Sequence, residues 1–425
     1  MITDYKPRIA DRLLARKLAG KGAVLVEGVK WCGKTTTAEQ LAKSVLYMSE
    51  TGKVEQNKQL AKINPALLLR GERPRLIDEW QVAPQLWDSI RFESDHASQL
   101  GLFILTGSSV PADLSEVVHS GTGRMSWLRM RTMSLWESGD STGEISLSDL
   151  FSSPGEISGI GEHSLEKIAF LACRGGWPLA VGMEPEIALD QAFDYIDAVE
   201  KRDISLADNV ERDPVSTHRL LRSYSRHQGT QASYGVIKSD LSSNESKSLD
   251  EDTIASYIRA LKKIFVIDDV EAWNPNLRSK AAIRTSDTHY FTDPSIATAA
   301  LGLGPNDLIN DLNTFGLIFE TLCIRDLRTY SEAINGQVYH YRDKNGLECD
   351  AVVHLRNGNY GLIEIKLGGD NLIEEGSRSL LTLANRIDIT KMKRPSFLMV
   401  LIAVGSYAYR REDGVYVVPI GCLKD

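Results

Sequence analysis

A lysine–threonine pair, Lys34-Thr35, follows two glycines at a spacing that can bind phosphate. Gly28 and Gly33 allow the backbone to curl until several N–H groups point at one anion. The helix expected after the loop adds the positive end of its dipole. Lys34 can then reach the β- and γ-phosphates of a nucleotide, and the Thr35 hydroxyl can bind Mg²⁺.

The position of this loop in the chain supports the same interpretation. A short apolar run at 23–26 precedes it and a helix-like segment at 37–44 follows, so it joins a strand to a helix. The alternative is a glycine-rich turn with an exposed lysine. The loop residues expected to contact the nucleotide are Gly28, Lys30, Cys32, Gly33, Lys34, Thr35 and Thr36.

Two acids, Asp78 and Glu79, come directly after short apolar residues at 76–77. If these residues form a parallel strand, its end lies beside the phosphate loop, where Asp78 would hold Mg²⁺ directly or through water. Glu79 would orient and deprotonate the attacking water, as a general base must. Acids also follow strands simply as solvated ends, and that alternative stays open.

Hydroxyl side chains end the next expected strand, at 101–105. Thr106 is suited to sense the γ-phosphate, with Ser108 as the second choice, unless the segment is only a Gly-Ser turn. A second glycine-rich loop, 119–124, ends in Arg124. An arginine from the same chain or a neighbour would neutralise charge developing on the γ-phosphate. A structural ion pair would explain Arg124 equally well.

Charged residues recur on the expected strands of the C-terminal region. Strand 347–353 carries Asp350, and strand 360–366 carries Glu364 and Lys366. Because side chains alternate along a strand, Glu364 and Lys366 face the same side, and a hairpin would bring Asp350 near them. Two carboxylates holding Mg²⁺ and a lysine positioning hydroxide would make a phosphodiester-cleaving site. The alternative is a hairpin with charged outward positions.

Length and composition place these motifs in an ordinary globular chain. With 425 residues, 42% of them hydrophobic and 25% charged, we expect two or three domains. The net charge of −8 argues against a large non-specific nucleic-acid surface but allows a local basic patch. Five scattered cysteines without a C-x-x-C pair suit a reducing cytoplasm and no zinc site. We expect no signal peptide and no membrane span.

The middle of the chain changes character. Three short helices, expected at 217–227, 233–239 and 252–264, precede a strand at 265–270. This order suggests a winged helix-turn-helix whose basic third helix would contact DNA. The acidic flanks equally allow a winged helix used as a spacer or a protein contact.

The elements that position these motifs predict an α/β fold in several parts. An amphipathic helix at 5–20 leads into the first strand, a Ser-, Gly- and acid-rich stretch at 138–160 marks a boundary, and helices over 164–202 suggest a lid. The expected parts are a P-loop nucleotide domain at 1–150, a helical lid at 151–210, a winged-helix-like domain at 211–300 and an α/β domain at 301–425.

Taken together, the motifs resemble the prokaryotic AAA-superfamily ATPases whose C-terminal region is a domain of unknown function with a restriction-endonuclease-like fold. The resemblance covers essentially the whole chain. Its signatures include Tyr5-Lys6-Pro7-Arg8-Ile9, the phosphate loop, Leu76-Ile77-Asp78-Glu79-Trp80-Gln81, the 103–108 strand, the 119–124 loop, Gly175-Gly176-Trp177-Pro178 and the closing segment 414–420.

The resemblance implies ATP and Mg²⁺ at the first domain, with the usual roles for Lys34, Thr35, Asp78 and Glu79. Val29 stands where a proline is common, which leaves the phosphate contacts intact. The C-terminal domain is similar to the PD-(D/E)XK nucleases. There Glu320 matches the helix glutamate, Asp350 the metal aspartate, and Glu364-Ile365-Lys366 the E-x-K motif.

Three functions follow as hypotheses. The first is a switch or mechanochemical ATPase whose C-terminal domain only binds a partner or DNA. Such an ATPase could act as a homo-oligomer. The second is an ATP-regulated DNA endonuclease, motivated by the complete acidic-lysine set. The third is a non-enzymatic adaptor that senses ATP and hydrolyses it poorly.

Overall fold

The computed structural model describes the chain except residues 1–4, 111–120, 154, 244–248 and 275–285. The chain forms two compact units, each built from several segments. The first unit comprises Met1–Thr132, Ala198–Pro214 and Ser256–Val266. The second unit comprises Met133–Asp197, Val215–Ala255 and Ile267–Asp425.

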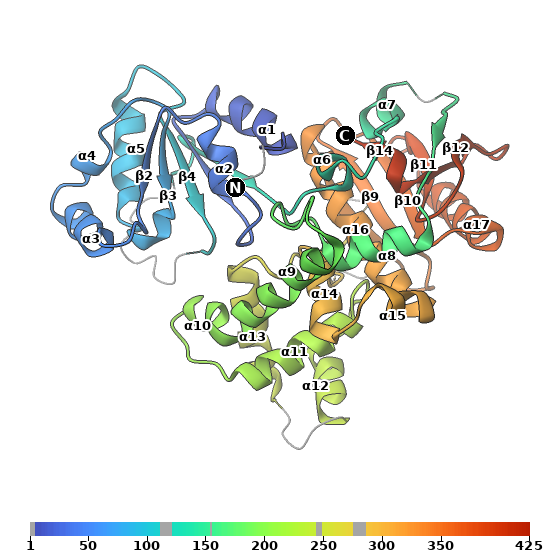
Figure 1. Ribbon diagram of the computed structural model, residues 1–425. Coiled ribbons are helices and arrows are strands. Elements are labelled where there is room, and N and C mark those ends of the chain that lie inside the picture. Colours follow the sequence, from blue (N-terminus) through green and yellow to red (C-terminus); the bar gives the residue numbers. More distant parts are fainter. Residues whose placement is uncertain (1–4, 111–120, 154, 244–248, 275–285) are drawn as a thin grey trace. The chain divides into compact units, whose positions relative to one another are not determined.

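A five-stranded sheet in the order β2-β3-β4-β1-β5 forms the centre of the first unit, with all its strands parallel (Figure 1). Parallel strands are covered on both faces, which explains their short, continuous apolar runs. The strands are β1 (Ala23–Glu27), β2 (Ser44–Tyr47), β3 (Arg75–Asp78), β4 (Phe103–Gly107) and β5 (Met125–Arg129).

Helices pack on this sheet as the periodicity predicts. They are α1 (Ile9–Leu18), α2 (Lys34–Glu39), α3 (Val54–Ile63), α4 (Pro65–Leu68) and α5 (Leu86–His96). Between β2 and β3 the chain forms two helices, α3 and α4, rather than one. Because Pro65 has no N–H to donate, it suits the first position of a new helix, and α4 begins there.

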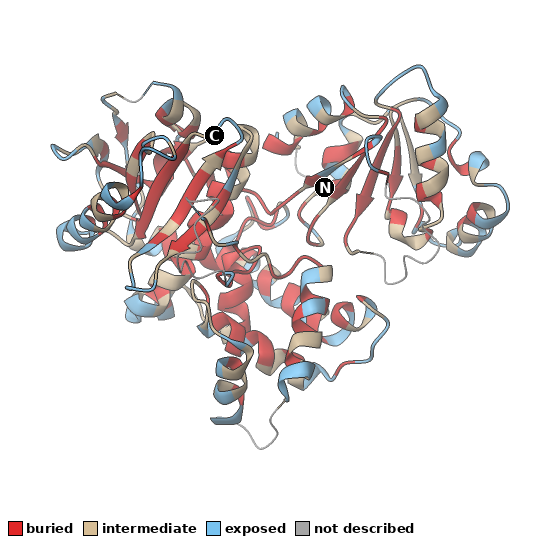
Figure 2. Cartoon of the chain, turned by 180° about the vertical axis from the view of Figure 1, so that it is seen from behind, coloured by how far each residue is buried: buried red, intermediate tan, exposed pale blue. Residues whose placement is uncertain are grey.

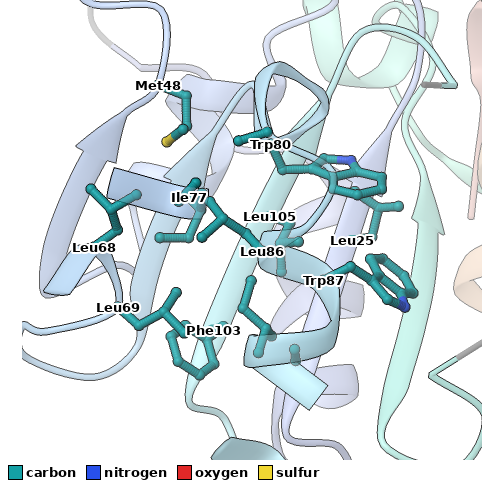
Figure 3. Close-up of a cluster of buried hydrophobic side chains, with 14 of the residues drawn as sticks. Leu25, Met48, Leu68, Leu69, Ile77, Trp80, Leu86, Trp87, Phe103 and Leu105 are labelled. Carbon is teal, nitrogen blue, oxygen red and sulfur yellow. The ribbon is translucent and has the colours of Figure 1, made fainter. Parts of the chain in front are cut away.

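One apolar cluster fills the space between the sheet and α5 (Figure 3). Leu25, Ile77 and Leu105 come from three adjacent strands and are at most 4% exposed. Trp80 and Trp87 pack on them, with ring centroids 5.1 Å apart. The motif tryptophan Trp80 is therefore a core residue that anchors the chain immediately after Glu79.

A mixed seven-stranded sheet in the order β7-β12-β13-β11-β10-β9-β8 forms the second unit's core. Within it, strand β10 runs antiparallel to β9 and parallel to β11. The strands are β7 (Gly159–Ile160), β8 (Gly336–Arg342), β9 (Glu348–Leu355), β10 (Tyr360–Lys366), β11 (Phe397–Ile402), β12 (Tyr407–Arg410) and β13 (Tyr416–Pro419).

Two long helices, α16 (Leu312–Ala333) and α17 (Asp370–Arg386), pack against the strands of this sheet. Figure 2 shows that the inner strands of both sheets are buried almost throughout, whereas α17 has an exposed outer face. The strands β9 and β10 lie close to the ranges 347–353 and 360–366 that we expected for them.

The segment after Thr132 packs with the C-terminal sheet rather than with the nucleotide domain. Its short strand β6 (Ile145–Ser146) pairs in parallel with β14 (Leu423–Lys424), the last strand of the chain. The first boundary therefore lies near 132, earlier than the expected 150. The expected lid is also divided, because 198–214 belongs to the first unit.

The middle region is helical. Its helices include α6 (Leu135–Ser138), α7 (Leu147–Ser152), α8 (Leu165–Arg174), α9 (Pro185–Ala198), a π-helical turn (Val199–Asp203), α10 (Ile204–Leu206), α11 (Pro214–Arg226), α12 (Tyr234–Ser243), α13 (Glu251–Lys263), α14 (Pro294–Leu301) and α15 (Pro305–Asn310). The strand expected at 265–270 is reduced to two antiparallel bridges, Ile267 with Phe291 and Val270 with Thr288.

A buried ion cluster holds four segments of the second unit together. Arg325 on α16 lies 3.2 Å from Asp293 and 2.7 Å from Asp326, and all three residues are at most 2% exposed. Asp293 also accepts the Gly176 N–H, and Asp326 accepts the Leu135 N–H, each at 2.9 Å. The Gly-Gly-Trp-Pro motif is thus tied to this cluster through Gly176.

We expect Arg325→Ala to destabilise the second unit by about 3–5 kcal/mol, because it leaves two buried carboxylates without their cation. Denaturant unfolding monitored in this unit would measure the change. Lys391→Ala removes an exposed ion pair with Asp388 and should cost less than about 1 kcal/mol. An equally small effect of both substitutions would show that the cluster does not stabilise the unit.

Candidate functional site

The glycine-rich loop after β1 has the curled backbone that phosphate binding requires. Gly28 has φ +155°, and a Cβ there would lie 2.0 Å from the Met130 carbonyl oxygen, so no larger residue fits. Gly33 has φ +97°, in the left-handed region that favours glycine. The Lys34 ammonium donates to the Val29 carbonyl oxygen at 2.8 Å and is held within the loop.

Asp78 lies at the centre of the residues that could hold a metal ion. The hydroxyl groups of Thr35 and Thr106 both donate to its Oδ1 atom, at 2.6 and 2.7 Å. The sheet brings these three side chains together from the first turn of α2, the end of β3 and the end of β4. Thr35 and Asp78 are close enough to bind one Mg²⁺ as oxygen ligands.

Glu79 follows in a constrained conformation. Its φ of +55° is uncommon for a residue with a side chain. Its backbone N–H donates to the Thr106 hydroxyl at 3.2 Å, and its carboxylate accepts hydrogen bonds from Ser108, at 2.9 Å, and from Gln81. The sequence assigned no role to Gln81, because nothing in its spacing shows that it turns back toward Glu79.

The remaining loop residues have separate surroundings. Lys30 forms an ion pair with Asp203 of the π-helical turn at 2.6 Å. Cys32 is buried, and its thiol donates to the Met130 carbonyl oxygen at 3.6 Å. Thr36 is exposed on α2. Each of the five cysteines is described, and each is a buried free thiol.

Arg124 lies at the opposite edge of the sheet from the phosphate loop of its own chain. The N–H groups of Gly22 and Ala23, where β1 begins, donate to the Arg124 carbonyl oxygen at 3.0 and 3.3 Å. The loop follows the other end of β1, about 15 Å further along the strand. The Arg124 side chain pairs with Asp95 of α5. His119 and Ser120 of the same motif lie outside the described residues.

A second group of charged residues lies on the C-terminal sheet. The Lys366 ammonium is 2.9 Å from the Glu364 carboxylate and 3.9 Å from the Asp350 carboxylate. The Ile365 N–H donates to Asp350 at 2.7 Å, and the Ser379 hydroxyl donates to Glu364 at 3.2 Å. The antiparallel pairing of β9 with β10 thus brings together the three residues that alternation predicted.

Two residues of the middle region, Tyr290 and Gly229, lie against Glu320. The Tyr290 hydroxyl donates to the Glu320 carboxylate, and Tyr290 itself is 1% exposed. A Cβ added at Gly229 would come within 2.9–3.1 Å of the same carboxyl group. Tyr290 and Gly229 therefore cover Glu320, an arrangement that the sequence did not predict.

Burial and crowding change the protonation of this second group. Burial and the nearby Asp350 charge raise the pKa of Glu364 to about 8. Burial likewise raises the pKa of Asp350 and, together with the Asp350 charge, that of Glu320. Burial alone would lower the pKa of Lys366, but the Asp350 and Glu364 carboxylates raise it above its usual range.

Within the described ranges, no group of three or more His, Cys, Asp and Glu side chains is placed to hold a metal ion. A cation on the C-terminal sheet would have Asp350 and Glu364 as its carboxylate ligands in the present arrangement. No helix of the described residues is long and apolar enough to cross a membrane.

The raised pKa of Glu364 predicts a pH-dependent stability. A carboxyl whose pKa rises from 4.5 to about 8 on folding contributes stability that is present below pH 4.5 and lost as the pH rises through 8. Glu364→Gln lacks this loss, so its stability relative to the unmodified chain should increase by about 4 kcal/mol between pH 5 and 9.

Denaturant unfolding at several pH values would measure this difference. Glu412→Gln is the control, since Glu412 is exposed in the same unit. Parallel pH profiles of Glu364→Gln and the unmodified chain would contradict the prediction.

Comparison with known protein families gives three matches along the chain. Residues 20–138 match the model of the AAA domain. Residues 165–307 match a domain of unknown function, DUF8612, and residues 315–423 match another, DUF4143. A search of curated proteins found no match.

Two solved structures show more distant similarity. The Walker-type ATPase PABY2304 of Pyrococcus abyssi is 14% identical, with 70% of this chain and 96% of that chain covered and a TM-score of 0.43. A point variant of RuvB from Thermotoga maritima is 16% identical, with 61% and 87% covered and a TM-score of 0.25. At these TM-scores neither similarity supports a functional argument. The N-terminal part of the chain is an AAA-type P-loop ATPase domain, followed by two domains of unknown function.

Proposed function

We propose that the first unit binds ATP with Mg²⁺ and hydrolyses it. The observation that carries this proposal is the convergence of Thr35 and Thr106 on one oxygen of Asp78. In a nucleotide complex, Thr35 and Asp78 would hold the ion, which neutralises charge on the phosphate oxygens. Lys34 would exchange the Val29 carbonyl for a phosphate oxygen.

Glu79 is the proposed general base. A base must lie within hydrogen-bonding reach of the water that it activates, and its carboxylate must have a defined direction. Ser108 and Gln81 hold that carboxylate, while Thr106 bonds both Asp78 and the Glu79 N–H. Thr106 is thus the proposed sensor, because a change at Asp78 reaches Glu79 through it.

Arg124 is proposed to act on the phosphate of a neighbouring chain. Its place at the far edge of the sheet excludes direct contact with the phosphate loop of its own chain. This role would require a homo-oligomer in which one protomer presents Arg124 to the next.

We expect the unmodified chain to bind ATP and release phosphate with Mg²⁺, and Lys34→Ala to lose binding by at least about tenfold, because the lysine meets the β- and γ-phosphates. Glu79→Gln should bind ATP with little turnover. Titration with labelled ATP and a phosphate-release assay measure both. Lys58→Ala, on the exposed face of α3, is the matched control. Unchanged ATP binding by Lys34→Ala would contradict the proposal.

For the rest of the chain, we propose a winged-helix-like domain near 211–300 and a PD-(D/E)XK-like domain near 301–425, after a divided helical lid. The three helices α11, α12 and α13, followed by the bridges of Ile267 and Val270, support the winged helix. Helix α16, strands β8 to β10, helix α17 and strand β11 follow the order of a nuclease-like core. The proposed partner of either domain is DNA, or a protein if the chain works as an adaptor.

A second function, ATP-regulated cleavage of DNA, is favoured by one specific observation. Asp350, Glu364 and Lys366 come within hydrogen-bonding or ion-pairing distance on adjacent strands. Two carboxylates and a lysine could hold a divalent cation and position hydroxide. Tyr290 opposes this function as the structure stands, because its hydroxyl engages Glu320.

We expect Tyr290→Phe to nick plasmid DNA with Mg²⁺ or Mn²⁺ at least about threefold faster than the unmodified chain. The substitution removes the hydrogen bond from the Tyr290 hydroxyl to Glu320, and a hydrogen bond of this kind is worth about 1 kcal/mol. Asp350→Ala should abolish nicking in both backgrounds. Tyr341→Phe, on strand β8, is the control. If neither the unmodified chain nor Tyr290→Phe cuts DNA or RNA with either metal, with or without ATP, the nuclease hypothesis fails and the adaptor or switch remains.

A further inference from the structure

Arg8, in the opening motif of the chain, reaches the phosphate loop. It directly precedes α1, and its backbone N–H donates to the Asp11 carboxylate at 2.8 Å, which caps that helix. Its guanidinium group extends away from the helix and is buried, with the residue 6% exposed. Nη1 donates to the Cys32 carbonyl oxygen and Nη2 to the Arg131 carbonyl oxygen, each at 2.9 Å.

The first of these hydrogen bonds constrains a peptide group of the loop itself. Because a trans peptide is planar, its carbonyl and its N–H point in opposite directions. Holding the Cys32 carbonyl toward Arg8 therefore directs the Gly33 N–H away from Arg8. The Gly33 N–H is one of the donors expected to meet phosphate, and Gly33 has the left-handed φ that such a loop requires.

The second hydrogen bond, to Arg131, holds the segment against which the loop packs. Residues 130–131 continue from the end of β5, and the Met130 N–H donates to the Glu27 carbonyl oxygen at 2.7 Å. The Met130 carbonyl oxygen approaches Gly28 and accepts from the Cys32 thiol. Arg8 therefore forms hydrogen bonds both with the phosphate loop and with the residues after β5 against which the loop packs.

The chain segment that carries Arg8 is also held in place, by Tyr5. The Tyr5 hydroxyl donates to Asp11 at 2.5 Å and lies 3.1 Å from the Thr37 hydroxyl on α2, the helix that the phosphate loop begins. The opening segment therefore contacts the loop at Cys32 and its helix at Thr37. A planar guanidinium can bond two carbonyl groups at once, which a lysine ammonium on a flexible stem does with less definition.

We propose that Arg8 is a positioning residue for polyphosphate binding, which sets the direction of the Cys32–Gly33 peptide and fastens the loop to the end of β5. This inference rests on the proposed binding of ATP at the loop. Arg8 acts through the loop backbone, on contacts that ATP, ADP and the transition state share. Losing such contacts weakens binding of all three alike, so KM rises while kcat changes little.

The kinetic test compares Arg8→Ala and Arg8→Lys with Lys6→Ala, which removes an exposed positive charge two residues away. We expect Arg8→Ala to raise KM for ATP and Kd for ADP by about tenfold or more, with kcat within about threefold of the unmodified chain. Arg8→Lys should lie between, and Lys6→Ala should change neither. A fall in kcat at constant KM would instead indicate a smaller folded fraction and overturn the proposal.

A second measurement needs no nucleotide and therefore separates this inference from the proposed ATPase activity. Amide hydrogen exchange should be faster by about tenfold over residues 28–34 in Arg8→Ala, while strand β4 (Phe103–Gly107) stays protected. Equal protection of the loop in both proteins would overturn the inference, even if the unmodified chain binds ATP. Equal loss of protection in β4 and the loop would also overturn it, because Arg8 would then stabilise the whole unit. If the unmodified chain binds no nucleotide, the proposed function fails separately.

Discussion

Parallel pairing in the first sheet is the constraint on which the nucleotide site depends. In a parallel sheet the carboxyl ends of all strands lie at one edge, so β1, β3 and β4 must deliver the residues that follow them to the same place. The phosphate loop, Asp78 with Glu79, and Thr106 with Ser108 are these residues. Their hydrogen bonds then fix the details, since Thr35 and Thr106 both donate to Asp78 and Ser108 donates to Glu79.

The same constraint explains why Arg124 is remote and Arg8 is near. Arg124 precedes β5 and must lie at the edge where the strands begin, whereas Met130 and Arg131 follow β5 and lie behind the loop. Gly28 allows the Met130 carbonyl to approach, and Arg8 bonds the next carbonyl and the loop together. The loop is thus supported by strand ends and by the opening segment, in addition to its own glycines.

The C-terminal group of charges follows a different physical principle. Asp350 and Glu364 lie close together and largely buried, so their mutual repulsion and desolvation favour protonation, and Lys366 offsets only part of that cost. A cation would offset it further. Glu320 is held by Tyr290 instead, and the Arg325 cluster fixes α16, which carries Glu320, to Asp293 and to the loops at Leu135 and Gly176. The state of this second group therefore depends on how the middle region packs on α16.

By itself, the sequence determined the AAA-type P-loop domain, its parallel strands and the pairing of Glu364 with Lys366 on one face, because glycine conformation, hydrophobic runs and strand alternation are local properties. It also predicted that Thr35 and Thr106 lie near Asp78. Only the tertiary structure decided the boundary near 132, the edge at which Arg124 lies, and the contacts of Arg8, Gln81 and Tyr290. Each of these depends on groups far apart in the chain, or on a side chain turning back on its neighbours, and such contacts leave no periodic pattern in the sequence.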